Sequence, residues 1–412
     1  MPAKLIEIEE ARRLVLERVT PLDAEKVALR DALGRVLAED VESADAVPGF
    51  DNSAMDGYAV RAADTGGASA DAPVELRLAD ESRAGSPAVA TLAEGEAIAI
   101  STGAAVPEGA DSVVRVEDTA SNDSRVEIKV EVEAGRNVRR AGEDIEPGET
   151  VLRSGTPIGA AELGVLASIG RTSVLCRRRP RVHVLSTGDE LIEPGEPLTP
   201  GAVRNSNSYT VPPLAAAAGA EVTAVEIVPD DPESTRQAIA GALEADLVVI
   251  CGGVSVGPHD HVRPALAELE AKEVFWGVSL KPGKPTWFGV APSGALVFGL
   301  PGNPVSAMVT FLLFARPGLL AMVGLDPAHD RASAILEDEI PKKPGRTQAV
   351  RCSLELGDDG WHATSTGAQG SHVLTSMLGA DALAILPADA GDVPAGTRVE
   401  IEFLPRGLLS TA

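Results

Sequence analysis

The stretch from residue 246 to residue 285 constrains the fold of this chain more than any other. A mostly apolar run at 246–250 indicates a buried strand, which leads into Cys251-Gly252-Gly253 and then to the acid Asp260. Lys281-Pro282-Gly283-Lys284 follows as a stiff turn that carries two positive charges. Glycines after a strand let backbone N–H groups approach a phosphate, and a carboxylate can hold a metal ion. The stretch therefore predicts a strand end that binds a nucleotide or another phosphorylated ligand.

Alternating strand and helix patterns surround this stretch between residues 179 and 325. Strands are predicted at 182–185, 222–228, 246–250 and 294–298, with helices that begin near Ser208, Ser234, Val262 and Pro304. Such alternation indicates a doubly wound α/β domain with a parallel sheet, whose ligand site lies at the carboxyl ends of the strands. Acids follow three of the strands, at Asp189-Glu190, Asp230-Asp231 and Asp260. A metal-nucleotide edge is the favoured interpretation, although a single such acid is more often a helix cap.

The rest of the chain is rich in strand patterns. Short strands at 74–78, 97–100, 112–116 and 125–130 predict a small β-rich domain, and those at 349–352, 362–364, 382–386 and 399–403 predict a C-terminal β barrel or sandwich. Apolar spacing predicts helices at 8–19, 23–39 and 159–169. In the polar loop at 47–60, we expect Phe50, Met55 and Tyr58 to be packed.

The charge of the chain limits its partners. Acidic residues outnumber basic ones by 61 to 36, for a net charge of −25, which argues against nucleic acid and anionic membranes. An anionic ligand then needs locally gathered bases, and the sequence offers Arg136, Arg139, Arg140, Lys281, Lys284, Arg346 and Arg351. The chain has no run of 18 apolar residues and no apolar signal core, so we expect no membrane span and a cytoplasmic location. The three cysteines match no zinc spacing and are expected to be buried.

Several motifs, in one order along the chain, resemble those of the molybdopterin molybdenumtransferase family, which is related to the C-terminal part of gephyrin. They lie at residues 48–60, 101–104, 135–145, 186–191, 252–260, 281–285 and 299–306. A series of ordered motifs is far more specific than any one loop, and the resemblance covers essentially the whole chain.

The resemblance implies a multidomain α/β plus β protein with four domains. They are an elongated linking domain (1–26 with 46–53 and 145–177), a β-rich inserted domain (27–45 with 54–144), an α/β molybdopterin-binding domain (178–326) and a C-terminal β domain (327–412). It also implies a homodimer with a shared active site, and contact with molybdopterin adenylyltransferase as a further partner.

The implied reaction joins molybdate to adenylylated molybdopterin, cleaves the pyrophosphate link with Mg²⁺ and releases AMP. The expected catalytic residues are Asp56, Thr102, Asp144, Glu190, Asp230, Asp260, Lys281 and Lys284. Binding of the pterin substrate is expected from Ser186, Gly188, Asn205, Gly252, Gly253, Ser255, Pro301, Pro304, Arg136, Arg351 and Ser371. Glu190 and Asp260 are the expected Mg²⁺ ligands. Asp56, Thr102 and Asp144 are expected from the partner subunit, with Asp56 as an orienting acid or base.

Three alternatives remain open. A molybdopterin adenylyltransferase would resemble residues 179–325 alone and would consume ATP. A non-catalytic molybdopterin-binding scaffold would bind the substrate without releasing AMP. Tungstate has nearly the size and charge of molybdate, so the sequence does not separate the two anions.

Overall fold

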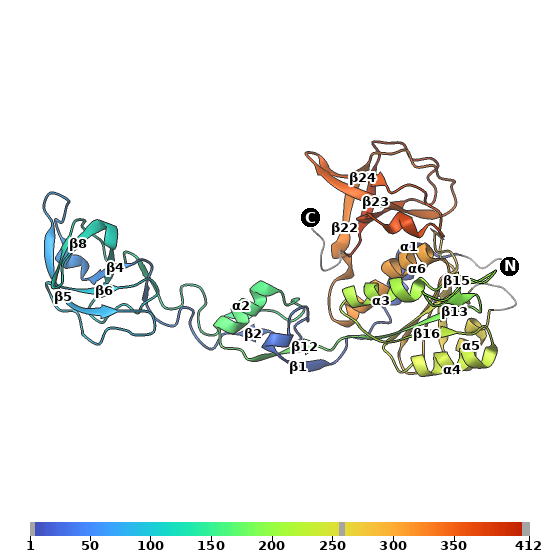
Figure 1. Cartoon of the computed structure of the whole chain (residues 1–412), viewed down its shortest axis with the longest axis horizontal. Coiled ribbons are helices and arrows are strands. Elements are labelled where there is room, and N and C mark those ends of the chain that lie inside the picture. The colour runs from blue at the N-terminus through green and yellow to red at the C-terminus, as the bar shows by residue number, and fades with distance from the viewer. Residues whose placement is uncertain (1–4, 255–259, 406–412) are drawn as a thin grey trace. The chain divides into compact units, whose positions relative to one another are not determined.

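A computed structural model describes residues 5–254 and 260–405, and the chain divides into two compact units (Figure 1). The larger unit comprises Met1–Lys26, Gly34–Ala38 and Leu175–Ala412. The smaller unit comprises Val27–Leu33 and Glu39–Val174. The expected division into four domains stays a prediction.

A six-stranded sheet forms the centre of the larger unit. Its order is β16 (Glu221–Val228), β13 (Arg181–Thr187), β17 (Leu247–Cys251), β21 (Leu296–Leu300), β20 (Trp287–Val290) and β18 (Lys272–Trp276). The first four strands are parallel, as the sequence predicts, whereas β20 and β18 are antiparallel. The strand patterns of the sequence do not predict this antiparallel edge.

Helices cover both faces of this sheet. Successive residues of a strand point to opposite faces, so a strand that is apolar throughout has apolar side chains to bury on each face. Val249 of β17 packs into a core with α1 (Ile8–Leu16), α3 (Asn207–Ala217), α6 (Pro304–Thr310) and α7 (Arg316–Met322). Its neighbours Val248 and Ile250 pack into a second core with α4 (Pro232–Ala242) and α5 (Val262–Glu268). Figure 1 shows these two helical layers on either side of the sheet. The doubly wound α/β arrangement is therefore confirmed.

The helical segment Pro304–Met322 is long and apolar. It runs through α6, a π-helical turn at Phe311–Ala315 and α7, and its 19 residues have a mean hydropathy of 1.7. On length and composition alone it is able to cross a membrane. However, 83% of it is buried inside the protein, as in a core helix of this kind.

The last part of the larger unit is a closed β barrel. Its strands are β22 (Arg331–Leu336), β23 (Thr347–Gly357), β24 (Gly360–Ser365), β25 (Ala382–Leu386) and β26 (Arg398–Phe403). β25 pairs with both β26 and β23, which closes the ring. Of the two predicted forms, barrel and sandwich, the barrel is confirmed. The short strand β19 (Leu280–Lys281) pairs in parallel with β23.

The smaller unit contains the predicted β-rich region. Its six-stranded sheet has the order β7 (Ser112–Arg115), β4 (Gly57–Val60), β6 (Glu96–Ile100), β5 (Val74–Ser82), β9 (Arg125–Ile128) and β8 (Thr119–Ser121). Two short ribbons, β2 (Val41–Glu42) with β11 (Thr150–Leu152) and β3 (Asn52–Ser53) with β10 (Val138–Arg139), complete its strands. Helix α2 (Ala160–Ser168) lies where the sequence predicts it.

The predicted helix at 23–39 is wrong. The chain instead forms strand β1 (Ala24–Ala28) and a single 3-10 turn at Leu29–Asp31. Gly34 then adopts a φ of 71°, which ends any right-handed helix. Within the larger unit, Leu37 pairs with Cys176 of β12 (Ser173–Arg177), so strand pairing satisfies backbone groups that a helix would otherwise bond.

Two further expectations concern single side chains. Tyr58 is buried as expected, but Phe50 and Met55 are 53% and 43% exposed, so their predicted packing is wrong within the chain. Cys251 and Cys352 are buried, and burial raises the pKa of each thiol to about 12. Both are therefore thiols at neutral pH, as expected of small core residues.

Candidate active site

The carboxyl ends of four parallel strands meet at one edge of the sheet in the larger unit. Thr187 at the end of β13 lies opposite Val228 at the end of β16, and Cys251 of β17 lies opposite Leu300 of β21. The backbone N–H of Gly252 donates to Leu300 O at 2.9 Å, which fixes the start of the next loop. The predicted polar loops therefore begin side by side, where doubly wound sheets bind ligands.

The two glycines after β17 let their loop pass directly over the end of β13. Gly252 has a φ of 97° and Gly253 a φ of 62°. A Cβ atom at either glycine would lie 2.9 Å from Thr187 Oγ1, and at Gly252 also 2.8 Å from Thr187 O. Thr187 Oγ1 is buried and has no hydrogen-bond partner among the described residues. The loop thus leaves a hydroxyl without a protein partner beside two half-buried glycines.

Two of the acidic loops are tied to each other. The backbone N–H of Asp230 donates to Asp189 Oδ1 at 3.0 Å, and that of Asp189 to Asp230 Oδ2 at 3.4 Å. The Glu190 carboxylate lies over Gly188, where a Cβ would come within 2.5 Å of a carboxylate oxygen. The next acid, Asp231, caps α4 through Ser234 N–H at 2.9 Å, and the side chain of Ser234 and then its backbone N–H lower the pKa of Asp231. Asp231 therefore has a structural role, whereas Asp230 and Glu190 remain at the edge.

Asp260 differs from the other acids. Both of its carboxylate oxygens are buried, and neither has a hydrogen-bond partner among the described residues. Burial raises the pKa of this carboxyl, while the backbone N–H and the charge of Arg263, followed by the backbone N–H of Val262, act in the opposite sense. An unpaired carboxylate withdrawn from water is costly for stability, and such groups cluster at functional sites.

The acidic side chains at this edge supply only part of the ligands that a divalent cation needs. Across residues 5–254 and 260–405, no three His, Cys, Asp or Glu side chains come together as a complete metal cage. Mg²⁺, however, is usually held by one or two carboxylates together with water and substrate phosphates. The unpaired oxygens of Asp260 and the carboxylate of Glu190 match that donor set.

The turn at Pro301–Pro304 joins this edge to the barrel. Pro304 is the first residue of α6, and Val305 N–H donates to Ser371 O at 3.3 Å. The structure thereby brings the predicted Ser371 to the residue that follows the predicted Pro304. This contact links the glycine-rich loop of the barrel at residues 367–371 to the α/β sheet edge.

Lys281 and Lys284 flank a tight turn beside the barrel. Between them Gly283 has a φ of 120°, and a Cβ there would lie 2.4 Å from Thr310 Cγ2 of α6. Both lysines are exposed. Lys281 lines a cavity of about 720 Å³ together with residues of the barrel, including Ser365, Gly367, Gln369 and Gly370. The lysine turn and the glycine-rich loop therefore share one hollow.

The smaller unit brings two other predicted residues together. Asp56 Oδ1 accepts a hydrogen bond from Thr102 N–H at 2.7 Å. Asp144 donates its backbone N–H to Val47 O at 3.0 Å, and Arg136 O accepts from Val113 N–H at 2.9 Å. These backbone contacts hold the predicted side chains on the loops around β3 and β10.

Three comparisons with known proteins cover the chain. Family models match residues 6–170 (MoeA N-terminal region, domains I and II), 183–321 ("Probable molybdopterin binding domain") and 333–404 (MoeA C-terminal region, domain IV). The molybdopterin molybdenumtransferase of Haemophilus influenzae is 37% identical over 97% of this chain and 98% of its own length. The chain belongs to the molybdopterin molybdenumtransferase family.

Other relatives agree with this assignment. The molybdopterin molybdenumtransferase of Bacillus subtilis is 35% identical over 96% of this chain and 93% of its own length. A solved molybdopterin biosynthesis moeA protein from Pyrococcus horikoshii is 33% identical, with a TM-score of 0.83 over 98% of this chain and 100% of that one. The expected family, its fold class and its status as a transferase enzyme are confirmed.

Two residues of this molybdenumtransferase family member were missed by sequence reasoning. Asn207 Nδ2 donates to Gly302 O at 2.8 Å, and its buried Oδ1 has no partner in the described part of the chain. The nearby Asn205, which was predicted, is 1% exposed and donates to Ser208 Oγ at 2.6 Å. Ser208 Oγ in turn lies 3.3 Å from Ser186 Oγ, another predicted residue. The only sequence signal for Asn207 is its place in an Asn-Ser-Asn run before a helix.

Gln369 is the second missed residue. Its Oε1 accepts Arg351 N–H at 2.9 Å, and its Nε2 donates to Arg351 O at 3.2 Å and to Gly367 O at 3.1 Å. Gln369 therefore pairs with β23 as a neighbouring strand would. The predicted Arg351 is only 1% exposed, and its guanidinium bonds Ser376 Oγ at 3.1 Å and Gly370 O at 3.4 Å. Burial lowers the pKa of Arg351 to about 10.

The predicted site roles stay predictions, since contacts alone assign no chemistry. Ser255 lies outside the described residues. Among those that are described, the structure brings Gly188, Glu190, Asp230, Gly252, Gly253, Pro301 and Pro304 to the strand ends or their loops. Asp56, Thr102, Asp144 and Arg136 lie in the other unit.

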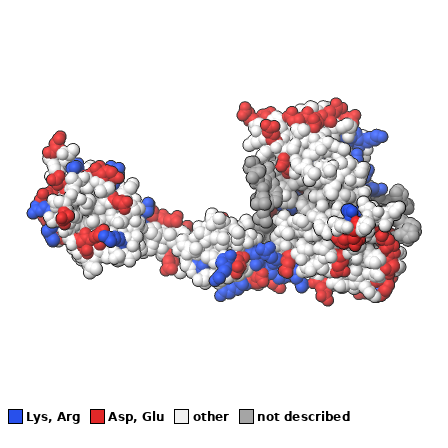
Figure 2. Space-filling model, in the orientation of Figure 1, with Lys and Arg blue, Asp and Glu red and all other residues white. Residues whose placement is uncertain are grey.

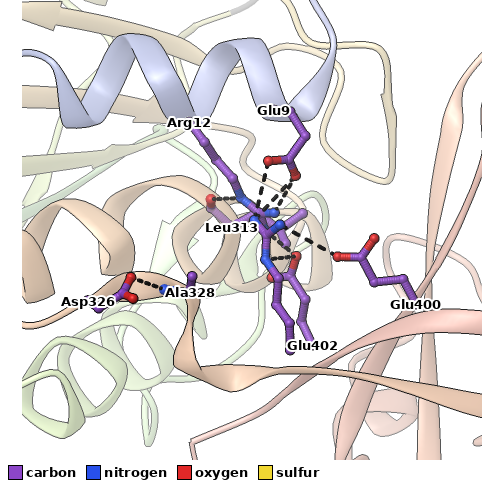
Figure 3. A network of polar contacts seen from close by, with 8 residues as sticks. Glu9, Arg12, Leu313, Asp326, Ala328, Glu400 and Glu402 are labelled. Carbon is purple, nitrogen blue, oxygen red and sulfur yellow. Dashed lines mark hydrogen bonds and ion pairs between the residues drawn. The ribbon is translucent and has the colours of Figure 1, made fainter.

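A separate cavity of about 580 Å³ beside α1 was not predicted (Figure 3). Arg12 there donates to Leu313 O at 3.0 Å and pairs with Glu402 at 2.5 Å and Glu9 at 2.8 Å. Figure 3 shows the side chains of Glu9, Arg12 and Glu402 directed toward one another. Because the buried arginine is already neutralised, the network ties α1 to the barrel and is not a candidate active site.

Proposed function

We propose that this chain inserts molybdenum from molybdate into adenylylated molybdopterin, with Mg²⁺-dependent cleavage of the pyrophosphate link and release of AMP. Binding of molybdenum to two thiols of the pterin releases one water, and cleavage of the phosphoanhydride consumes one, so the reaction balances. The activity in the names of its full-length relatives supports this proposal.

The observation that carries the proposal is the edge at which Gly252 and Gly253 cross Thr187, together with the unpaired carboxylate oxygens of Asp260, which follows this loop in the chain. Backbone groups of the glycine loop and the free Thr187 hydroxyl suit phosphate oxygens. Glu190 and Asp260 would hold Mg²⁺, which offsets negative charge on the phosphates when bound. Asp230, tied to Asp189, would keep the acidic loop in register with the phosphates.

Lys281 and Lys284 would attract the molybdate oxyanion. A lysine ammonium is a compact charge on a flexible stem, so it suits an anion that arrives and reacts. The contact between Val305 and Ser371 supports a pocket in which the barrel loop closes one side.

We further infer that the active enzyme is a homodimer with a shared active site. Asp56, Thr102 and Asp144 belong to the smaller unit, whereas Glu190, Asp260 and the lysines belong to the larger one. Mixing inactive Asp56→Asn and Asp260→Asn proteins under conditions of subunit exchange tests this idea. A shared site predicts recovery of about a quarter of the wild-type activity, because half of the dimers gain one intact site. No recovery would place all these residues in one subunit. A cytoplasmic location and contact with molybdopterin adenylyltransferase stay predictions.

The decisive experiment measures AMP release from adenylylated molybdopterin by purified protein with Mg²⁺, with and without molybdate. We expect AMP release that requires molybdate and does not require ATP. Tight binding of the pterin without release would instead support the scaffold alternative, and ATP consumption would support the adenylyltransferase. Tungstate in place of molybdate tests the preference for the anion.

A further inference from the structure

A second cavity adjoins the hollow beside Lys281, and its walls are basic. It has a volume of about 500 Å³ and is lined by the barrel turn at residues 341–346 together with Lys281, Gln348 and Asp392. Its bases are Lys281, Lys342, Lys343 and Arg346, against the single acid Asp392. The protein carries a net charge of −25, and Figure 2 shows acidic side chains spread widely over the faces drawn. The four bases around this cavity therefore form a local positive region on a protein whose net charge is negative.

The basic turn is held in place before any ligand binds. Lys342 donates its backbone N–H to Asp392 Oδ1 at 2.8 Å, and its Nζ donates to Ala388 O at 3.2 Å and Ala390 O at 2.8 Å. Gly345 N–H donates to Ala388 O at 2.7 Å. A prearranged turn loses little conformational entropy when it binds an anion.

The charges in this turn lack anionic partners of their own. None of Lys281, Lys343 and Arg346 forms an ion pair within the described residues; Arg346 donates only to Leu280 O, at 3.3 Å. Burial lowers the pKa of Lys342, Asp389 opposes this effect, and the charge of Lys281 adds to it. The two ammonium groups thus repel each other, and a bound anion would relieve that repulsion.

Gln348 supplies an independent indication of a ligand. It is 4% exposed and lines both this cavity and the neighbouring cavity of about 720 Å³. Its side-chain amide makes no hydrogen bond to the residues that the structure describes. The amide of Gln348 faces these cavities, so its donor and acceptor are available to a polar ligand there.

The two cavities share Lys281, Pro341 and Gln348 but differ in charge. The neighbouring cavity has the acids Asp338 and Glu339 in its lining, whereas the basic one has only Asp392. An anion is therefore attracted first to the basic side.

We propose that the cavity lined by Lys342, Lys343 and Arg346 is a receiving subsite for the tetrahedral oxyanion substrate. The dianion binds there and passes Lys281 and Gln348 to the cavity closed by the loop at residues 367–370. This inference rests on the proposed function, which names molybdate as the anion.

The test compares the double variant Lys343→Gln, Arg346→Gln with Lys272→Gln. All are charge-to-amide changes, and Lys272 is an exposed base on β18 with no ion pair among the described residues. Molybdate binding without pterin is measured by calorimetry, and the KM for molybdate is measured by AMP release. The double variant is expected to weaken binding and raise the KM by about tenfold, the effect of losing one charge-assisted hydrogen bond. The kcat of the double variant is expected to stay near the wild-type value. For Lys272→Gln, molybdate binding, KM and kcat are all expected to stay near wild type.

Unchanged molybdate affinity and KM in a folded double variant would overturn the subsite, even with normal AMP release. Conversely, wild-type protein that releases no AMP but binds molybdate through these residues would refute the proposed function and keep the oxyanion site. If circular dichroism shows that the double variant is unfolded, Lys343→Gln alone provides the test, because Lys343 is exposed and makes no described ion pair.

Discussion

Asp56 Oδ1 accepts a hydrogen bond from the backbone N–H of Thr102 at 2.7 Å, although the two residues are 46 positions apart. The next residue, Gly57, lets β4 lie close against β7, because a Cβ there would lie 1.9 Å from Val114 O. The carboxylate is exposed but oriented by a fixed donor, as an acid or base that acts on a bound substrate must be.

Asp56→Asn is expected to remove the negative charge of this side chain while keeping its hydrogen bond to Thr102. The amide oxygen can still accept from Thr102 N–H, so the free energy of unfolding should change by less than about 1 kcal/mol. AMP release should fall by about 10²–10⁴-fold if Asp56 is an acid or base. Asp123→Asn, at another exposed position of the same unit, is the control. Normal turnover of Asp56→Asn would remove that role.

Asp260→Asn is expected to abolish a stabilising effect of Mg²⁺. A cation that binds only the folded state raises the melting temperature, and Asp260 supplies unpaired buried oxygens for it. Thermal unfolding with and without Mg²⁺ should therefore show a shift for wild type and little or none for the variant. Asp231→Asn keeps its helix cap and should keep the shift. A full Mg²⁺ shift in Asp260→Asn would exclude it as a ligand.

Gly252→Ala is expected to destabilise the protein by about 1–3 kcal/mol, because a side chain at φ 97° is strained and would press on Thr187 O. Gly241→Ala in α4 is the matched control. Nothing lies within 4 Å of a Cβ there, and alanine in a helix is expected to add about 0.5–1 kcal/mol. Urea unfolding measures the change in the free energy of unfolding for both variants. Equal changes at the two glycines would contradict the interpretation that Gly252 is required where the loop crosses Thr187.

Gln369→Glu is expected to loosen the barrel loop at residues 367–371. The second carboxylate oxygen would face Arg351 O and Gly367 O, which now accept from the amide. Loss of a buried hydrogen bond costs about 1–3 kcal/mol. We expect a higher KM for molybdate with a smaller change in kcat, measured by AMP release. Gln237→Glu, at an exposed site on α4, should leave both unchanged. A purely structural role would reduce stability without raising the KM.

Asp51→Asn is expected to make stability less dependent on pH. The N–H of Ala141 and then the ion pair with Arg140 lower the pKa of Asp51 in the folded protein. A lowered folded pKa stabilises the protein above the unfolded value of about 3.9, and this contribution is lost as the pH falls through the folded pKa. Urea unfolding should show wild type more stable than the variant at neutral pH, with the difference vanishing in acid. A difference that is constant with pH would contradict this assignment.

Much of the larger unit was predictable because its signals are local. Apolar runs such as 246–250 form central parallel strands, and the glycines after them require turns with positive φ. The helix predicted at 23–39 failed because its apolar spacing suits a helix, yet Gly34 and the pairing of Leu37 with Cys176 decide otherwise. The edge strands β18 and β20 were missed because their patterns are short and irregular.

The sequence by itself determined the family, the alternation of the parallel strands and helices of the α/β domain, and the loops that carry acids, lysines and glycines. These features depend on neighbouring residues and on ordered motifs. Only the tertiary structure decided that Thr187 lies beneath Gly252, that Asn207 bonds Gly302, and that Gln369 holds the barrel loop on β23. Such contacts join residues far apart in the chain, and their formation depends on the packing of whole layers rather than on any local pattern.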